Sequence, residues 1–319
     1  MGYVYDWVLM ALIHLGSGDR ELARLWAAWA FSGRAPVRWP TAEDDLNRLV
    51  LQNEARLLAL LPADAEGLVK LHERGVEVRR AERGAASDVA LLALGELAEH
   101  LAALGRHDEA IARFEEARRL DPDRWRHPRS TGPWFPLGML RLRGGDVDGY
   151  HALCAEALRR FGGTTSRSDA GHLAIFCTGS PAVEVDPGRP LKLARHAVAS
   201  DPDEPAFLPA LGAAEYRAGR HEAAVATLTR ALGLLPQDAH WGRAHAGLFL
   251  AMARRRLGQV EEARRALAEA DHALAVAPAE PDPASPLFAW DWCERALGQV
   301  LRREAGEVLG VAPPPGADD

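Results

Sequence analysis

Between residues 91 and 122 the chain carries two segments in which apolar and polar residues alternate with the period of a helix. In the first segment, apolar residues recur at three- and four-residue spacing from Leu94 to Leu101, which places them in one stripe along a helix. Gly105 follows, and glycine suits the left-handed residue that comes directly after a helix terminus. The pattern therefore predicts a helix that ends just before Gly105.

The second segment begins with acidic residues and ends at a proline. Asp108 lies in its first turn, where a carboxylate complements the helix dipole. Phe114 and Ala117 continue the apolar stripe, and Pro122 ends the helix because its ring cannot continue the hydrogen-bond ladder. Residues 91–122 are thus predicted to form two antiparallel helices joined by a short turn.

The same order of landmarks recurs along the chain. A second clear copy covers 211–236, and an arginine-histidine-acid run that starts at Arg220 opens its second helix. A third copy begins at Trp134, but Tyr150 replaces the usual small residue, so its two helices are expected to pack further apart. Weaker copies lie in 7–23, 169–202 and 250–270. Such internal repetition predicts a helical repeat protein.

These landmarks resemble the tetratricopeptide repeat (TPR), a unit of about 34 residues that runs W-x2-L-G-x2-Y and then Gly, Ala, Phe, Ala and Pro. The resemblance covers roughly two thirds of the chain and is poor in residues 36–90. It implies an all-α fold, an α-α superhelix of antiparallel helix hairpins. The arrangement also resembles the repeat tails of bacterial regulatory proteins that carry a serine/threonine kinase upstream, although no kinase motif is present here.

The two ends of the chain share a longer pattern, because residues 6–55 follow the same order of landmarks as residues 248–305. We therefore predict that residues 1–62 form the end of a first TPR-like array and that residues 63–310 form a second array. Each array is expected to finish with a longer closing helix. Residues 311–319 are predicted to form a disordered tail.

The composition of the chain limits the cellular compartment and the class of binding partner that we expect. The chain of 319 residues is 48% hydrophobic and 26% charged, which fits a folded protein, and its net charge of −7 argues against binding to the phosphates of nucleic acid. The three cysteines have no C-x-x-C spacing, so neither a disulfide framework nor a zinc site is expected, and a cytoplasmic location fits best. The apolar stretch 8–13 is too short to span a bilayer.

The sequence shows no catalytic set. It contains no phosphate-binding loop, no G-x-S-x-G elbow and no H-E-x-x-H motif. His107 and His221 occupy the same repeat position and are interpreted as structural. Glu215 stands where the TPR family usually has a tyrosine, and we interpret it as the partner of a nearby arginine such as Arg217 or Arg220. We expect no catalytic residue, no metal site and no cofactor.

The resemblance implies that the first helix of each hairpin lines a concave groove in which partner peptides usually lie. The groove-facing positions of the family select an apolar set with a basic side in this chain: Glu99, Phe135, Met139, Leu142, Arg143, Tyr216, Arg217, Met252, Arg255 and Arg256. We expect this groove to bind an extended or helical segment with apolar anchors and acids, while the arginines pair with its carboxylates. The alternative is that these arginines are only solvated.

The predicted function is therefore a non-catalytic scaffold for protein–protein interaction. One alternative is a small-ligand sensor or enzyme with a pocket where the two arrays meet, near residues 36–90, and another is a passive spacer. Family members that clamp chaperone tails use asparagines on their first helices, and Asn47 and Asn53 are the only asparagines here, so that receptor type is not expected. The sequence leaves the partner and the oligomeric state open.

Overall fold

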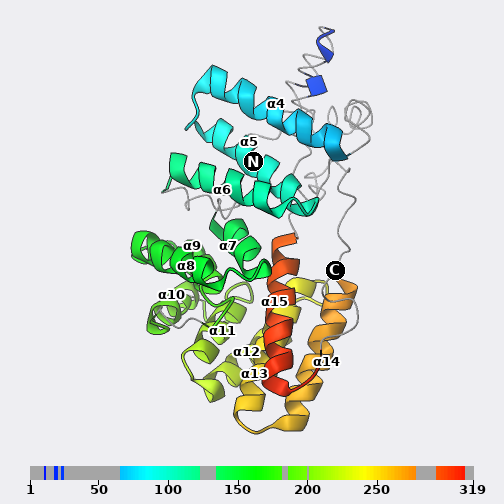
Figure 1. Cartoon of the computed structure of the whole chain (residues 1–319). Helices are drawn as coiled ribbons and strands as arrows, with labels where there is room; N and C mark the ends of the chain where they lie inside the picture. The colour runs from blue at the N-terminus through cyan, green and yellow to red at the C-terminus, as the bar shows by residue number, and fades with distance from the viewer. Residues whose placement is uncertain are drawn as a thin grey trace, which may run out of the picture. The chain divides into compact units, whose positions relative to one another are not determined.

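The structure of the chain is a computed structural model, and all the regular elements in its described residues are α-helices (Figure 1). The described residues are 11, 18–20, 23–24, 65–122, 134–181, 186–199, 201–277 and 292–312. No helix in this part of the chain combines the length and the apolar character that a membrane crossing requires. The predicted all-α class is confirmed.

The chain divides into two compact units. Unit 1 contains residues 1–122 and 279–292, and unit 2 contains residues 123–278 and 293–319. The predicted boundary after residue 62 and the predicted closing helix of 1–62 fall outside the described residues and stay predictions. The same is true of the predicted tail beyond residue 312.

In unit 1 the described helices are α4 (Ala65–Arg83), α5 (Asp88–Ala103) and α6 (His107–Leu120). The side chain of Ser87 caps α5 by accepting a hydrogen bond from the backbone N–H of Ala90. Helix α4 packs on α5, and α5 packs on α6. The hairpin predicted for residues 91–122 is therefore present as α5 and α6.

In unit 2 the helices follow one another as hairpins and end with a single long helix. They are α7 (Trp134–Arg143), α8 (Val147–Phe161), α9 (Arg167–Phe176), α10 (Gly188–Val198), α11 (Leu208–Arg217), α12 (His221–Leu234), α13 (His240–Arg256), α14 (Val260–Val276) and α15 (Trp292–Leu309). Each of the pairs α7 and α8, α9 and α10, α11 and α12, and α13 and α14 is in contact. The predicted series of helix hairpins is confirmed by these helices.

One glycine turn joins the two helices in most hairpins. Gly105, Gly145, Gly219 and Gly258 have φ values of 74°, 78°, 71° and 77°, the left-handed conformation that favours glycine. After Gly105, the N–H of Arg106 bonds to the carbonyl of Leu101 at 2.9 Å, which completes a Schellman motif. The turns after α7, α11 and α13 repeat this bond. The repeated glycine therefore sets the direction of each second helix.

Small residues allow the two helices of a hairpin to approach closely. Ala110, Ala224 and Ala263 occupy the same position in α6, α12 and α14, and each is 0% exposed. Gly212 on α11 faces α12, and a Cβ atom at this glycine would lie 2.4 Å from Cγ of Leu228. The contact between α11 and α12 therefore depends on the missing side chain of Gly212.

Two glycine-to-alanine changes in the same hairpin separate close packing from helix propensity. Gly212→Ala should lower the free energy of unfolding by about 1–3 kcal/mol, because Leu228 must move. Gly233→Ala, at an exposed position of α12, should raise the free energy of unfolding by about 0.5–1 kcal/mol. No atom lies within 4 Å of the new Cβ, and alanine favours the helix. Urea unfolding followed by circular dichroism measures both, and equal effects would contradict the close contact.

Candidate functional site

Helix α15 lies across helices of unit 2 that precede it by many residues. Its residues contact α11, α13 and α14 and the segment 177–181 that follows α9. Figure 1 shows α15 running along this side of unit 2. We use the name α15 seat for the residues that receive it: Gly179, Arg217, Trp241, His245 and Asp271. A helix held by several repeats in this way is placed as a bound segment would be.

The side of α15 that faces the seat is apolar. Ala296, Leu297, Leu301 and Ala305 are at most 1% exposed. The four-residue spacing of Leu297, Leu301 and Ala305 forms one stripe, and burial of each leucine contributes about 1.5–3 kcal/mol. Glu307, on the same helix, is exposed. The apolar stripe therefore supplies the main contact area between α15 and its seat.

A buried ion pair joins the seat to the second half of α15. Two nitrogens of the Arg217 guanidinium donate to the two carboxylate oxygens of Glu304, and the Nη2–Oε2 distance is 2.6 Å. The Arg217 and Glu304 side chains are only 9% and 13% exposed. The Nε atom of Arg217 also donates to the carbonyl of Thr178 at 2.9 Å. Arg217 is thus held by α15 and by the segment after α9 together.

Two further polar contacts fix the helix. On α15, Arg302 donates through Nη2 to Oδ2 of Asp271 on α14 at 3.1 Å, and its Nε donates to the other oxygen of the same carboxylate. Near the start of α15, the His245 ring on α13 lies 3.1 Å from the carbonyl oxygen of Glu294 and 3.5 Å from its carboxylate. Polar and charged contacts along the length of α15 therefore set its register on the seat.

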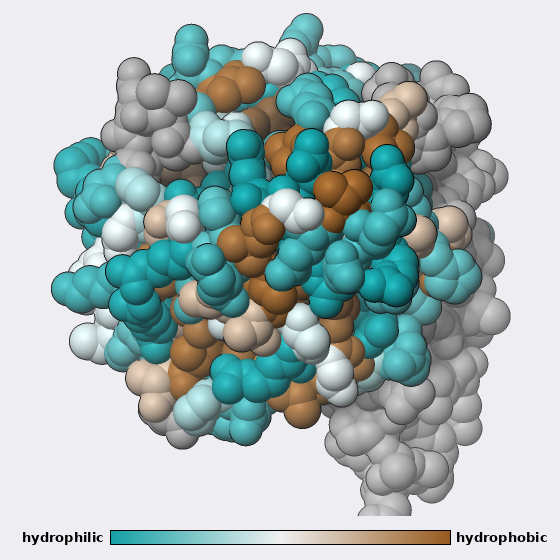
Figure 2. All heavy atoms as spheres, turned by 90° about the horizontal axis from the view of Figure 1, so that it is seen from below, coloured by the Kyte–Doolittle hydropathy of each residue, from teal (hydrophilic) through white to brown (hydrophobic). Residues whose placement is uncertain are grey.

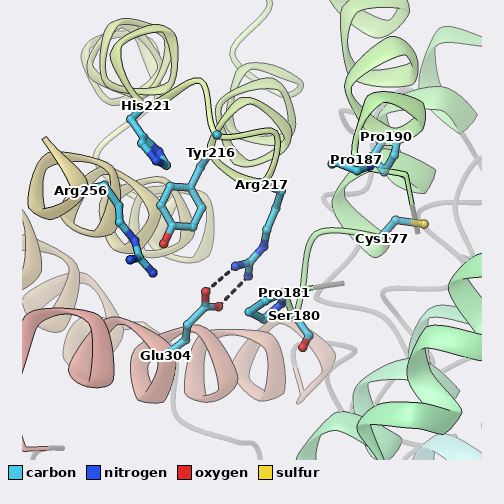
Figure 3. Close-up of a pocket in the computed structure, with 11 residues that line it drawn as sticks. Cys177, Ser180, Pro181, Pro187, Pro190, Tyr216, Arg217, His221, Arg256 and Glu304 are labelled. Carbon is cyan, nitrogen blue, oxygen red and sulfur yellow. Dashed lines mark hydrogen bonds and ion pairs between the residues drawn. The ribbon is translucent and has the colours of Figure 1, made fainter. Parts of the chain in front are cut away.

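A pocket of ≈ 320 Å³ opens beside Glu304. It is lined by Cys177, Ser180, Pro181, Pro187, Pro190, Tyr216, Arg217, Gly219, His221, Arg256 and Glu304. In Figure 3 the side chains of Tyr216, Arg217, Arg256 and Glu304 point toward one another, whereas the sulfur of Cys177 points away from them. The ends of α11 and α13, the start of α12 and helix α15 thus meet at one polar cluster.

The charge in this pocket is positive on balance. Glu304 neutralises Arg217, and among the described residues no carboxylate pairs with Arg256, which is exposed. Burial raises the pKa of Tyr216, and a hydrogen bond from Arg256 to its hydroxyl acts in the opposite direction. Tyr216 therefore keeps its proton at neutral pH and offers an O–H donor beside a guanidinium that has no carboxylate partner among the described residues.

The structure brings together three residues of the predicted groove set, Tyr216, Arg217 and Arg256, in this pocket. The apolar members of the set are buried, and none of them is more than 5% exposed: Phe135, Met139, Leu142 and Met252. These side chains therefore offer little area to a partner in this structure. Their assignment to partner binding stays a prediction.

The remaining members of the set lie elsewhere. Arg143 is half-buried at the end of α7, and Arg255 is exposed at the end of α13 but does not line the pocket. Glu99 belongs to α5 in unit 1. Glu215 accepts a hydrogen bond from Thr227 at 2.7 Å, so its observed partner is not Arg217, whose guanidinium binds Glu304. The interpretation that pairs Glu215 with Arg217 is wrong.

Sequence reasoning missed Glu304 and the residues that follow α9. Glu304 falls within the repeated pattern of residues 248–305, but nothing in the sequence links it to Arg217, which precedes it by 87 positions. Ser180 and Pro181 fall in a degenerate repeat whose position in space a sequence pattern does not give. Within the described residues, no group of three or more His, Cys, Asp or Glu side chains is arranged to hold a metal ion.

The exposed apolar residues are dispersed. Val147, Leu234, Val260, Val276 and Val311 are 37–45% exposed. On the face shown in Figure 2, apolar residues lie in small areas separated by polar side chains. The described surface on this face therefore resembles that of an ordinary water-exposed protein, and the pocket beside Glu304 is the more specific feature.

Removal of the Glu304 carboxylate should destabilise unit 2. Glu304→Ala leaves the Arg217 charge buried without its partner, so the free energy of unfolding should fall by about 3–5 kcal/mol. Glu307→Ala on the exposed side of the same helix should change it by less than about 0.5 kcal/mol. Urea unfolding compares the two variants, and similar small effects would show that the ion pair contributes little.

Glu99 should make unit 1 less stable as the pH rises. Burial raises the pKa of this half-buried carboxyl from 4.5 to about 7, so unfolding releases a proton between these values and stability falls as the pH increases through this window. Glu99→Gln, which has no charge at any pH, should leave stability unchanged near pH 4.5 and raise it above pH 7. Hydrogen exchange of α5 at both pH values measures the difference, and a benefit that is equal at both would contradict this assignment.

Comparison with known proteins gives matches at the level of solved structures. No protein-family model matches the sequence, and no curated protein matches it. The chain is similar to a tetratricopeptide repeat protein from Parabacteroides merdae, with 11% identity, a TM-score of 0.44 and coverage of 94% of this chain and 99% of that one. It is also similar to TTC0263, a thermophilic TPR protein in Thermus thermophilus, with 21% identity, a TM-score of 0.41 and coverage of 70% and 100%. For YrrB, described as a TPR protein with an unusual peptide-binding site, the identity is 14%, the TM-score 0.38 and the coverage 65% and 94%.

Proposed function

We propose that this chain is a non-catalytic protein-interaction scaffold and that its partner docks at the pocket beside α15. The observation that carries the proposal is the convergence of Tyr216, Arg217 and Arg256, three residues of the predicted groove set, on one open pocket. Residues of the five helices α10, α11, α12, α13 and α15 and of connecting segments meet there, so the pocket is held by the repeat scaffold itself.

Charge in the pocket favours an acidic partner. Arg256 has a guanidinium with no carboxylate partner among the described residues, and the Tyr216 hydroxyl lies next to it. A carboxylate that enters the pocket would accept hydrogen bonds from both groups, and charge-assisted bonds of this kind are about twice as strong as neutral ones. The segment that binds is therefore expected to carry an aspartate or glutamate.

Apolar residues supply the remaining contact area. Pro181, Pro187 and Pro190 line the side of the pocket away from Arg256. Proline rings have few degrees of freedom to lose on binding, so a rigid apolar wall of this kind costs little entropy to use. A partner segment with an acid and an adjacent apolar side chain matches both sides of the pocket.

The chemistry of the pocket supports binding over catalysis. Burial and a hydrogen bond with Cys154 raise the pKa of the Cys177 thiol, which keeps it protonated and unreactive. The Glu304 carboxylate is committed to Arg217. A second candidate function is a sensor of a small carboxylate ligand, because a volume of ≈ 320 Å³ is within the range of small-molecule pockets.

Two neighbouring arginines provide a matched test. Arg255 and Arg256 are both exposed at the end of α13, but only Arg256 lines the pocket. Affinity capture from the native host should recover a partner with the wild-type chain and with Arg255→Glu but lose it with Arg256→Glu. With the purified partner, Arg256→Glu should weaken binding at least about tenfold, because reversed charge repels the acid.

Three other outcomes would change the conclusion. Partners that are retained by both variants would place the binding surface away from the pocket. Loss with both variants, at unchanged helicity, would indicate a diffuse effect of charge and not a specific site. Recovery of no protein, together with binding of a small dicarboxylate such as glutarate that Arg256→Glu abolishes, would favour the ligand sensor.

A further inference from the structure

We infer that α15 is an exchangeable occupant of its seat, and that the partner presents an amphipathic helix with the pattern of α15. This inference rests on the proposed function, because it names the segment by which the partner binds. The described contacts supply the pattern: an apolar stripe like that of Leu297 and Leu301, an arginine at the position of Arg302 and an acid at the position of Glu304.

The seat has the properties of a binding surface for a helix. Its contacts with α15 are made by side chains of α11, α13 and α14 and not by the hairpin partner that every other helix of unit 2 up to α14 has. Gly298 of α15 approaches Leu274 closely, since a Cβ atom there would lie 2.9 Å from a Leu274 methyl group. Shape and charge in the seat are therefore both complementary to one face of a helix.

Arg217 provides the strongest reason to expect an acid at the position of Glu304. Its guanidinium is nearly buried, is held by the Thr178 carbonyl and lies over the rings of Tyr216 and Phe249 at 5.5 Å and 5.2 Å. A buried cation without a carboxylate is unfavourable, so a helix that replaces α15 must bring its own acid to this place. The seat consequently selects for a helix with a glutamate or aspartate there.

The pocket explains how a partner helix can displace α15, a segment of the same chain, from the α15 seat. A tethered segment faces its site at an effective concentration on the order of millimolar, so a free helix with identical contacts competes poorly. Helix α15 leaves Arg256 without a carboxylate partner among the described residues. A partner helix that also carries a second acid for Arg256 gains a contact that α15 lacks, and this difference drives the exchange.

The test uses the full chain and a fluorescein-labelled peptide of residues 292–312, with binding measured by fluorescence anisotropy. Glu304→Ala in the chain weakens the hold of α15, so this variant should bind the peptide at least about tenfold more tightly than the wild-type chain. Glu307→Ala, on the exposed side of the same helix, is the matched control and should bind like the wild type. Circular dichroism checks that both variants keep their helicity.

A second comparison uses two variants of the peptide, one changed at Glu304 and a matched control changed at Glu307. A peptide with Glu304→Ala should bind the Glu304→Ala chain at least about tenfold more weakly than the unchanged peptide, because Arg217 then has no acid. A peptide with Glu307→Ala should bind like the unchanged one. A helical Glu304→Ala chain that takes up no peptide, or that takes up both peptides equally, would overturn the inference.

A second measurement covers a variant that loses helicity. In the wild-type chain, unlabelled peptide in excess over the effective concentration of the tethered α15, which is on the order of millimolar, should increase hydrogen exchange in α15 by displacing it. Unchanged exchange at that peptide concentration would overturn the inference. Neither measurement depends on Arg256, whereas the capture experiment of the proposed function does. Failure of exchange and failure of the pocket as a docking site are therefore distinguishable.

Discussion

Each helix hairpin has an apolar face that it cannot cover by itself, and the rest of the structure depends on this constraint. Stacked hairpins cover one another only if their helices approach closely, and this approach requires residues such as Gly212, Ala110 and Ala224 at the contacts. In most hairpins, a left-handed glycine after the first helix then directs the chain back along the helix before it. The glycines and alanines that recur along the sequence therefore mark the positions where each hairpin turns and where its helices pack closely.

At the end of unit 2, the apolar face of a helix is covered in a different way. Within the described residues, helix α15 has no hairpin partner of its own, and it covers its apolar stripe by lying across α11, α13 and α14. An apolar stripe alone would allow the helix to slide or rotate, because burial of area has no direction. The ion pairs of Arg217 and Arg302 and the polar contact of His245 remove that freedom, and they make the seat selective for the helix that occupies it.

The same ion pair links packing with the proposed function. Arg217 is buried among Tyr216, Phe249 and the segment after α9, so it needs a carboxylate whenever the site is closed. Glu304 meets that need within the chain, while Arg256 at the rim of the pocket stays available. One guanidinium therefore stabilises the fold and the other faces the solvent, although both were selected by the same family pattern.

The sequence by itself determined the elements. Local periodicity, the turn glycines and the helix-ending proline at 122 predict the α5–α6 and α11–α12 hairpins, because each signal acts over a few residues of continuous chain. It also brought Tyr216, Arg217 and Arg256 into one candidate set, since repeat positions that share a face of the array can be counted along the chain.

Only the tertiary structure decided which of these side chains remain accessible to a partner. Phe135 and Met252 are buried. Arg217 is already paired, because α15 and the segment after α9 return to α11 from distant positions in the sequence. A repeat pattern predicts contacts between adjacent repeats, and it gives no information about a helix that folds back across several of them. The contact between Arg217 and Glu304 therefore follows from packing of the whole unit and not from any local signal.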